Sequence, residues 1–493
     1  MRISLDRSAG DGRPLYQQIA EGIRGELEAG RLGAGDRLPP IRELARRLAV
    51  NRDTVALAYE ALAAAGVVEA SVGRGTFVAR NGERAEPAHT APRPALSATT
   101  ERLLALERAR PRFGSANGAA PLHTLIPDPS LYPWDEFRRV LHRVLGKGGA
   151  ELLLYGEPRG HPAMREALGS RLRDAGLATQ ADDLVLCHGA SQGIALAVRL
   201  FAGPDDVVAL EEPTYNNVLA TIAGLGLRTA AVPMRKDGLD LAALERTLAR
   251  PEVKVLYTIP TFHNPLGTTT PLAHRRALLE IAARAGKPVI EDGDEMDLRF
   301  AGRPVPPLAA LDANGLVVHL SSFSKSLFPG VRIGAVAARG GLVDALLAQK
   351  RATDLSDAMP LQAALAEFVA SGAYDRHLVR LRRALCSRCD ALCESLARFL
   401  PGAAWTRPEG GMQLWVELPG GIDTTELLAD AVGAGVLFAP GSQFQHDAHP
   451  SSGLRLAFAM ADEVAIERGV AALGRLVTQR LAAGPRPAVG AHI

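Results

Sequence analysis

The chain has 493 residues, of which 47% are hydrophobic, so it is long enough for a small domain and a large one with sizeable cores. Its formal net charge of +2 excludes a globally basic protein, and any nucleic-acid contact must be local. The sequence contains no run of about 18 apolar residues, and its polar start lacks the apolar core of a signal peptide. We therefore expect a cytoplasmic protein without a membrane partner.

Residues 1–80 predict three helices followed by a two-stranded wing. An apolar stripe at helical spacing marks the first helix, and a tight connection at Val50-Asn51 separates the next two. Two short apolar runs then flank Gly73-Arg74, as strands around a wing do. The predicted elements are residues 14–28, 40–49, 52–65, 67–72 and 75–78. The pattern indicates a winged helix-turn-helix.

Several segments of this unit resemble the GntR-family DNA-binding domain, namely residues 35–39, 41–45, 54–59 and 73–78. The resemblance implies that the unit binds double-stranded DNA. Between residues 37 and 52, several arginines stand against a single acid, Glu43, around the predicted recognition helix. A charged, solvated helix surface is the alternative interpretation. The residues expected to contact DNA are Arg37, Arg42, Arg52, Thr54 and Arg74.

Residues 81–118 are interpreted as a linker. They include the proline- and alanine-rich run 85–95 and lack a persistent period beyond a short helical patch at about 103–109. The tail, residues 482–493, is expected to be disordered. The body of the protein therefore spans residues 119–481.

A small-residue turn, Gly189-Ala-Ser-Gln-Gly193, follows the strand-like segment 183–188 and opens a helical pattern. The free N–H groups and the positive end of a helix at such a turn can bind an anion, although ordinary turn chemistry gives the same pattern. Arg332, which follows Lys325 closely, supplies a guanidinium suited to a phosphate.

Three apolar, strand-like runs lead into groups that suit one chemistry, namely Asn264, Asp292 and Lys325. A lysine amine forms a Schiff base with an aldehyde cofactor, a carboxylate keeps a pyridine nitrogen protonated, and an amide hydrogen-bonds the ring oxygen. Alone, a lysine in a serine-rich turn is usually a surface residue. Together the three groups predict a pyridoxal-phosphate site, and Tyr215 is placed to stack on the ring.

Motifs in the same order resemble the fold-type I pyridoxal-phosphate aminotransferases. They are Tyr155-Gly-Glu-Pro-Arg-Gly160, residues 189–193, 212–215, 263–267, 291–292, Ser322-Phe-Ser-Lys325 and Arg332. The resemblance implies an α/β body with a mainly parallel sheet between helices and a smaller C-terminal α/β subdomain. The cofactor-binding residues that it implies are Lys325, Asp292, Asn264, Tyr215, Ala190, Ser191, Ser322, Arg332 and, from a second subunit, Tyr155.

Arg455 matches the arginine that grips the carboxylate of the amino acid in that family, although on its own it would be a strand-edge arginine facing water. Position 294 departs from the family. Relatives carry an aromatic donor shortly after the aspartate, and here the residue is Asp294. A register slip would exchange Asp292 and Asp294, because residues two apart share a strand face. The spacing to Lys325 favours Asp292 as the partner of the ring nitrogen. Lys325 is the predicted catalytic residue, because its amine forms the Schiff base.

Cys386, Cys389 and Cys393 have a spacing that invites a metal-site interpretation. They lie along roughly one face of an apolar helical stripe, which favours packing instead. We therefore expect no metal site.

A GntR-like head joined to an aminotransferase-like body is the arrangement of the MocR/GabR-like subfamily of GntR transcription regulators. The resemblance implies a regulator that senses a small amino compound by aldimine exchange and forms a domain-swapped, head-to-tail homodimer. One alternative is a working aminotransferase with an appended DNA-binding domain, and another is a regulator whose ligand is the cofactor itself. The acid at position 294 favours weak or no transaminase turnover.

Overall fold

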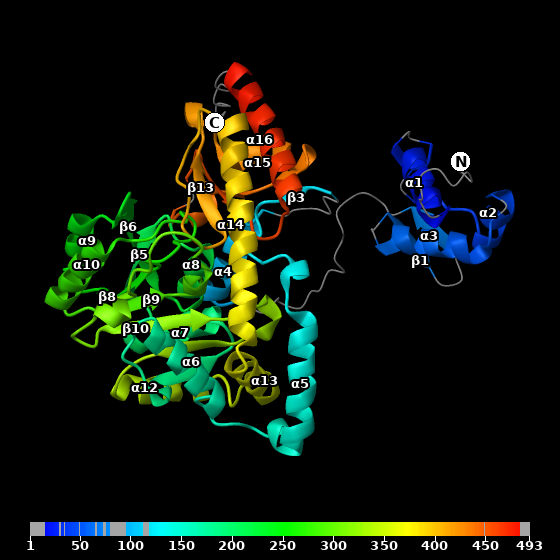
Figure 1. The fold of residues 1–493 in the computed structure, drawn as a ribbon. Coiled ribbons are helices and arrows are strands. Elements are labelled where there is room, and N and C mark those ends of the chain that lie inside the picture. Colours follow the sequence, from blue (N-terminus) through cyan, green and yellow to red (C-terminus); the bar gives the residue numbers. More distant parts are fainter. Residues whose placement is uncertain are drawn as a thin grey trace. The chain divides into compact units, whose positions relative to one another are not determined.

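The computed structural model describes residues 15–28, 31–33, 35–48, 50–64, 67–71, 75–78, 95–111, 118–447 and 449–483. The chain divides into two compact units, residues 1–95 and 96–493 (Figure 1). Within the described ranges, none of the helices has the length and apolar character needed to cross a lipid bilayer.

The first unit is a helical bundle with a two-stranded antiparallel sheet, which confirms the winged helix-turn-helix. Its core forms where apolar helix stripes meet, because Ile19 and Ile23 are fully buried together with Val55 and Leu62. The elements are α1 (Leu15–Glu28), α2 (Ile41–Leu48), α3 (Arg52–Ala64), β1 (Val68–Ser71) and β2 (Gly75–Val78).

An eight-stranded mixed sheet forms the centre of the second unit. Its strands are β4 (Leu184–Cys187), β5 (Val207–Glu212), β6 (Arg228–Arg235), β7 (Gly238–Leu239), β8 (Val253–Thr258), β9 (Val289–Asp292), β10 (Val317–Ser322) and β11 (Gly334–Ala337). They are ordered β4-β11-β10-β9-β8-β5-β6-β7. The five neighbouring strands β10, β9, β8, β5 and β6 are parallel to one another. The pairs at the two sides of the sheet, β4 with β11, β11 with β10 and β6 with β7, are antiparallel. The carboxyl ends of β5, β8, β9 and β10 therefore meet at one edge.

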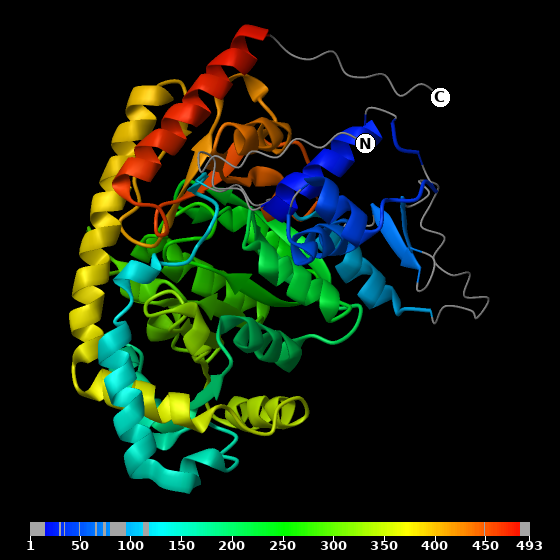
Figure 2. The same ribbon diagram turned by 90° about the vertical axis from the view of Figure 1, so that its right-hand side faces the viewer.

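Helices cover both faces of this sheet (Figures 1 and 2). Along β5, Val208 and Leu210 pack on one side, and Val207 and Ala209 pack on the other. Burial on both faces explains why these strands are nearly continuous apolar runs. The helices are α5 (Trp134–Gly148), α6 (Pro162–Asp174), α7 (Ala190–Phe201), α8 (Asn216–Gly224), α9 (Leu241–Leu248), α10 (Leu272–Ala285), α11 (Leu308–Leu311), α12 (Gly341–Arg351) and α13 (Met359–Ala370).

A smaller subdomain contains a four-stranded sheet, ordered β12-β13-β16-β15, and a two-stranded sheet of β3 and β14. The 27-residue helix α14 runs into it and packs along α16, as Figure 1 shows. Cys389 and Cys393 are buried in this core, and all four cysteines are free. The elements are β3 (Ala120–Pro121), α14 (Ala373–Phe399), β12 (Ala404–Trp405), β13 (Gln413–Glu417), α15 (Thr424–Gly433), β14 (Val436–Leu437), β15 (Ala439–Pro440), β16 (Gly453–Ala457) and α16 (Glu463–Ala483).

Part of the range expected to be a linker is folded against the body. Helix α4 (Ala98–Ala109) contacts α8, where Leu103 packs over Gly224. Ser97 caps α4 by accepting a hydrogen bond from the Thr100 amide at 3.2 Å. The rest of that range, residues 81–94 and 112–117, and the tail from residue 484 lie outside the described residues.

The close approach of α16 to the end of α14 predicts a stability effect. A Cβ atom on Gly474 would collide with the backbone carbonyl of Phe399, whereas Gly433 in α15 has nothing within 4 Å. We expect Gly474→Ala to lower the free energy of unfolding by about 1–3 kcal/mol. The control Gly433→Ala should be neutral or stabilising by up to about 1 kcal/mol. Thermal denaturation of both variants measures this, and equal unfolding temperatures would contradict it.

Candidate functional site

Lys325 lies in the turn that follows β10, at the edge where the parallel strands end. Its Nζ donates a hydrogen bond to the Leu125 carbonyl at 2.6 Å and is partly buried. Among the described residues, no carboxylate lies within ion-pair distance of this amine. The amine therefore faces the interior of the second unit without a fixed counter-charge.

Asp292 is the last residue of β9 and pairs with Leu320 of β10. It is 5% exposed, and its carboxylate accepts a hydrogen bond from the Tyr257 hydroxyl at 2.6 Å. Burial, followed by the nearby Asp294 carboxylate, raises the pKa of Asp292 to about 6. A positive group beside Asp292 would reverse that shift. A protonated pyridine nitrogen supplies such a charge.

Asp294 occupies the turn beyond β9, so Asp292 and Asp294 do not share the face of one strand as a register slip would require. The Asp294 amide donates to the Asp292 carboxylate at 3.1 Å. Burial raises the pKa of the Asp294 carboxyl, the nearby Lys325 charge and Ser322 side chain oppose the rise, and its Oδ1 has no hydrogen-bond partner among the described residues. The two acids thus hold different positions at the same strand end.

An anion cradle forms where α7 begins. Gly189 precedes the helix with φ of 78°, and a Cβ there would come within 2.9 Å of the Arg332 guanidinium. Arg332 donates to the His188 carbonyl at 2.6 Å and to the Ser324 hydroxyl at 3.4 Å. The first turn of α7, which holds Ala190 and Ser191, presents amides without intrahelical acceptors. A guanidinium beside a helix N-terminus suits a phosphate.

The two serines beside Lys325 have different contacts. Ser322 Oγ accepts a hydrogen bond from the Ser324 amide at 3.0 Å and contacts Asp294. The Ser324 hydroxyl is the one that meets Arg332. Ser322 was predicted from the sequence to bind the phosphate, whereas Ser324 was not, although both lie in the same serine-rich turn.

Asn264 and Arg455 connect the large sheet with the smaller subdomain. Arg455 donates to Asn264 Oδ1 at 3.0 Å and to the His123 carbonyl at 2.8 Å. Its guanidinium lies 4.9 Å from the centre of the Phe444 ring. Arg455 is 7% exposed, so it does not face water, and burial lowers its pKa to about 10. Such a desolvated guanidinium binds an incoming carboxylate strongly.

A buried acid holds the segment that carries Asn264 in place. Glu211 of β5 accepts a hydrogen bond from the Ile259 amide at 3.0 Å and lies 3.1 Å from His263 Nε2.

Tyr215 precedes α8, and burial raises its pKa to about 12. The charges that act on its hydroxyl include Asp292, Asp294 and Arg455. Tyr215 therefore lies beside the same cluster.

Glu295 belongs to the cluster and was missed from the sequence. It is 7% exposed, and its Oε2 has no hydrogen-bond partner among the described residues. Burial raises its pKa to about 8, against the opposing effects of Lys325 and Arg455. The signal that could have found it is the run of acids directly after a buried strand.

Tyr155 does not join the cluster within one chain. It is 82% exposed, and its neighbours Leu153 and Leu154 are 72% and 68% exposed. Its expected contact with the cofactor of a second subunit remains a prediction.

In the first unit, Arg42 of α2 and Arg52 at the start of α3 are exposed, and Thr54 is half-buried in the first turn of α3. Asn51 Oδ1 accepts a hydrogen bond from the Asp53 amide at 3.3 Å and so caps α3. The Arg37 guanidinium lies against the wing, 6.0 Å from the centre of the Phe77 ring. Arg74 lies outside the described residues.

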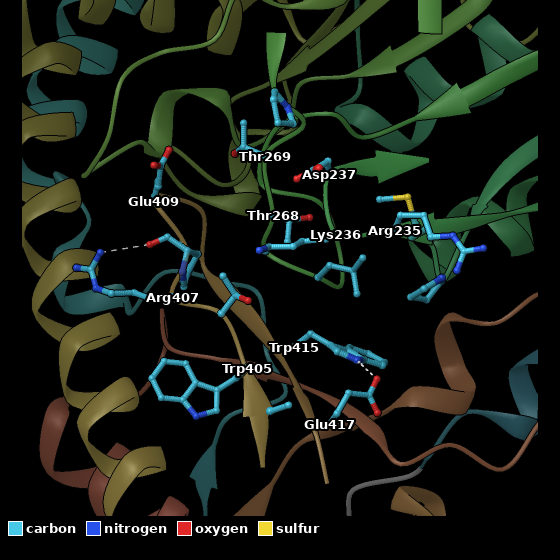
Figure 3. Close-up of a pocket in the computed structure, with 18 of the residues that line it drawn as sticks. Arg235, Lys236, Asp237, Thr268, Thr269, Trp405, Arg407, Glu409, Trp415 and Glu417 are labelled. Atoms are coloured by element: carbon cyan, nitrogen blue, oxygen red, sulfur yellow. Dashed lines mark hydrogen bonds between the residues drawn. The ribbon is translucent and has the colours of Figure 1, made fainter. Parts of the chain in front are cut away.

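A cavity of about 1090 Å³ lies beside the cluster without containing Lys325. Figure 3 shows the side chains of Trp405 and Trp415 on one side of it and Lys236 on the other. Trp415 pairs with Arg455 across β13 and β16, and its ring lies 6.0 Å from the Phe444 ring. Phe444 therefore contacts both Trp415, which lines this cavity, and Arg455.

Comparison with known proteins assigns both units. A family model described as "Bacterial regulatory proteins, gntR family" matches residues 15–78, and one described as "Aminotransferase class I and II" matches residues 133–473. The probable rhizopine catabolism regulatory protein MocR of Rhizobium meliloti is 30% identical over 98% of this chain and 99% of its own. The HTH-type transcriptional regulator TauR of Rhodobacter capsulatus is 32% identical over 94% of this chain and 95% of its own.

Among solved structures, the alpha-aminoadipate aminotransferase LysN of Thermus thermophilus, complexed with N-(5'-phosphopyridoxyl)-L-leucine, has a TM-score of 0.70. It is 30% identical, and the match covers 78% of this chain and 96% of LysN. The likeness to regulators thus spans the whole chain, and the likeness to aminotransferases spans the body.

The buried acids predict how stability depends on pH. Glu295 has a folded pKa of about 8, so the folded state keeps its proton while the unfolded chain ionises above the ordinary glutamate range. We expect the unfolding temperature of cofactor-free protein to fall as the pH rises from about 5 to about 8. Asp292 and Asp294 contribute in the same direction.

Glu295→Gln, which cannot ionise, should flatten this decline, and the exposed control Glu394→Gln should preserve it. Thermal denaturation at several pH values measures the effect. An unchanged decline in Glu295→Gln would show that the acid is not desolvated.

Proposed function

The chain belongs to the MocR-type regulators, in which a GntR-type head is joined to an aminotransferase class I and II body, and we propose that its body senses a small amino compound. This family depends on pyridoxal phosphate, which when bound supplies an aldehyde that condenses reversibly with amines and a ring that absorbs visible light. The observation that carries the proposal is the partly buried Lys325 amine at the sheet edge where Asp292 ends β9, at the same strand ends as the anion cradle of Arg332; its charge acts on Asp294 and Glu295.

Each residue of the cluster has a separate task in this proposal. Lys325 holds the aldehyde carbon, and Asp292 holds a proton on the ring nitrogen. Arg332 and the first turn of α7 bind the phosphate, with the Ala190 and Ser191 amides directed at it. The remaining roles are Asn264 at the ring oxygen, Tyr215 over the ring, Ser322 near the phosphate and Tyr155 reaching it from a second subunit.

Arg455 is proposed to receive the acidic group of the amino compound. It now donates to Asn264 and to the His123 carbonyl, so an arriving carboxylate would replace those contacts. Because Arg455 stands on β16 and Asn264 follows β8, this exchange changes how the subdomain meets the large sheet. The compound regulates DNA binding if its affinity differs between the two arrangements.

The exposed run Leu153 to Tyr155 supports a head-to-tail, domain-swapped homodimer, because apolar side chains of that size are normally covered. Two heads in such a dimer would bind two separated half-sites on double-stranded DNA. The head acts where DNA is accessible, which for a bacterial regulator is the cytoplasm.

Aminotransferase activity is the second candidate, since the cluster suits that chemistry and the body resembles aminotransferases. The Asp294 carboxyl, when ionised, supplies no hydrogen to a ring oxygen. We therefore expect weak transaminase turnover. Steady turnover of an amino donor with a keto acid would instead favour the aminotransferase as the function of the body. A difference in DNA affinity between cofactor-free and cofactor-bound protein, without any amine, would favour the cofactor as the ligand.

The cofactor assignment predicts that the purified protein is yellow and that Lys325→Ala abolishes this visible absorbance, because Lys325 holds the aldehyde. The matched control Lys236→Ala removes an exposed lysine outside the cluster and should retain the colour. Absorbance spectra after incubation with pyridoxal phosphate and dialysis test this. Colourless wild-type protein would refute the sensor.

The head assignment predicts that Arg42→Ala and Arg52→Ala each weaken DNA binding and lower its salt slope by about 0.9, one phosphate contact's worth. The control Arg24→Ala removes an exposed arginine of α1, and Lys325→Ala alters only the body. Both should keep most of the affinity. Binding isotherms at several salt concentrations measure this, and equal losses in all four variants would mean that the head does not dominate binding.

A further inference from the structure

Once the proposed contacts are made, not every acidic side chain of the site has a positively charged partner. Arg332 meets the phosphate, Asp292 meets the ring nitrogen, and Lys325 carries the aldehyde. Arg455 receives the acidic group of the amino compound. Asp294 and Glu295 are the buried acids that these contacts leave without a cation, and each has one carboxyl oxygen with no hydrogen-bond partner among the described residues. Asp294 stands where relatives carry the donor to the ring oxygen, so Glu295 is the acid beyond the ring that is free to meet another group.

The position of Glu295 directs it to the ligand. Its carboxyl lies against Gly411, where a Cβ atom would stand 2.7 Å from Oε2. The charges that act on it are those of Lys325, Asp294 and Arg455, which are the groups of the site. Oε2 is buried and has no partner within the described part of the chain. A buried acceptor without a partner is costly unless a ligand supplies a donor.

We propose that Glu295 selects amino compounds that carry a second cationic group, an ammonium or a guanidinium, in addition to the amine that reacts at Lys325. This inference rests on the proposed function and names the ligand class of the same site. Basic amino acids and diamines share the required chemistry. The raised pKa of Glu295 agrees with it, because an acid that lacks a cation when the site is empty retains its proton.

The test compares ligands that differ only in the second charge. Holoprotein is titrated with L-lysine and L-norleucine, with L-ornithine and L-norvaline, and with cadaverine, while the visible spectrum is followed. At least one basic amino acid should half-saturate at a concentration about tenfold or more below that of its neutral partner, because it forms a charge-assisted hydrogen bond. Cadaverine distinguishes diamines from basic amino acids, since it offers no carboxylate to Arg455.

Glu295→Gln should bring the ratio within each pair close to one. The exposed control Glu394→Gln should preserve the wild-type ratio. A preference for lysine or ornithine that survives in Glu295→Gln overturns the inference, as does equal binding within both pairs by wild type. In either case amine sensing itself stands. If none of these amines alters the wild-type spectrum but another amino compound does, the inference alone fails; if no amino compound alters it, the proposed function fails too.

A second measurement uses wild type alone and does not depend on folding of the variant. At pH 7 Glu295 is protonated, and a cation beside it drives its ionisation, so lysine should release more protons on binding than norleucine does. The charges of Lys325, Asp294 and Arg455 also act on this carboxyl, but their contributions are shared by both ligands. Calorimetry in buffers of different ionisation enthalpy measures the difference, which should vanish near pH 9. Equal proton release at pH 7 would overturn the inference.

Discussion

The parallel pairing of β5, β8, β9 and β10 is the constraint on which the site depends. Parallel strands end at one edge of the sheet, so each polar residue that follows an apolar run is delivered to the same place. Asp292 ends β9, and Lys325 follows the neighbouring strand within one turn. Buried ionisable groups within the strands, such as Glu291 and His319, pair with each other, whereas Asp292 and Lys325 stand at the strand ends.

Burial then sets the chemistry of what the sheet delivers. Asp292, Asp294 and Glu295 all have raised pKa values because they lose water, and burial likewise lowers the pKa of the Arg455 guanidinium. A bound phosphate and pyridine ring add charges that the empty arrangement lacks. The contact between Arg455 and Asn264 joins the subdomain to the strand end, so a ligand at this contact acts on both parts of the body.

Local sequence patterns were enough to predict the winged helix-turn-helix and the strand ends that carry the site. The helical stripe of Ile19 and Ile23 and the apolar runs before Asp292 and Lys325 can each be recognised within a short stretch of sequence. The packing of α4 on α8 was not predictable, because its apolar patch is short and its partner lies far along the chain. The distinct contacts of Ser322 and Ser324, and the burial of Glu295 and Arg455, depend on tertiary packing. The role of Tyr155 depends on a second chain.

The central claim is that an amine arriving at Lys325 alters how the head binds DNA. Its most direct test is the affinity of full-length, cofactor-bound protein for a DNA fragment that it binds, measured with and without a saturating amino compound, in wild type and in Lys325→Ala. The account predicts that the compound changes the wild-type affinity severalfold and leaves that of the variant unchanged. An equal response in both proteins, or none in wild type with a compound that alters its visible spectrum, would contradict it.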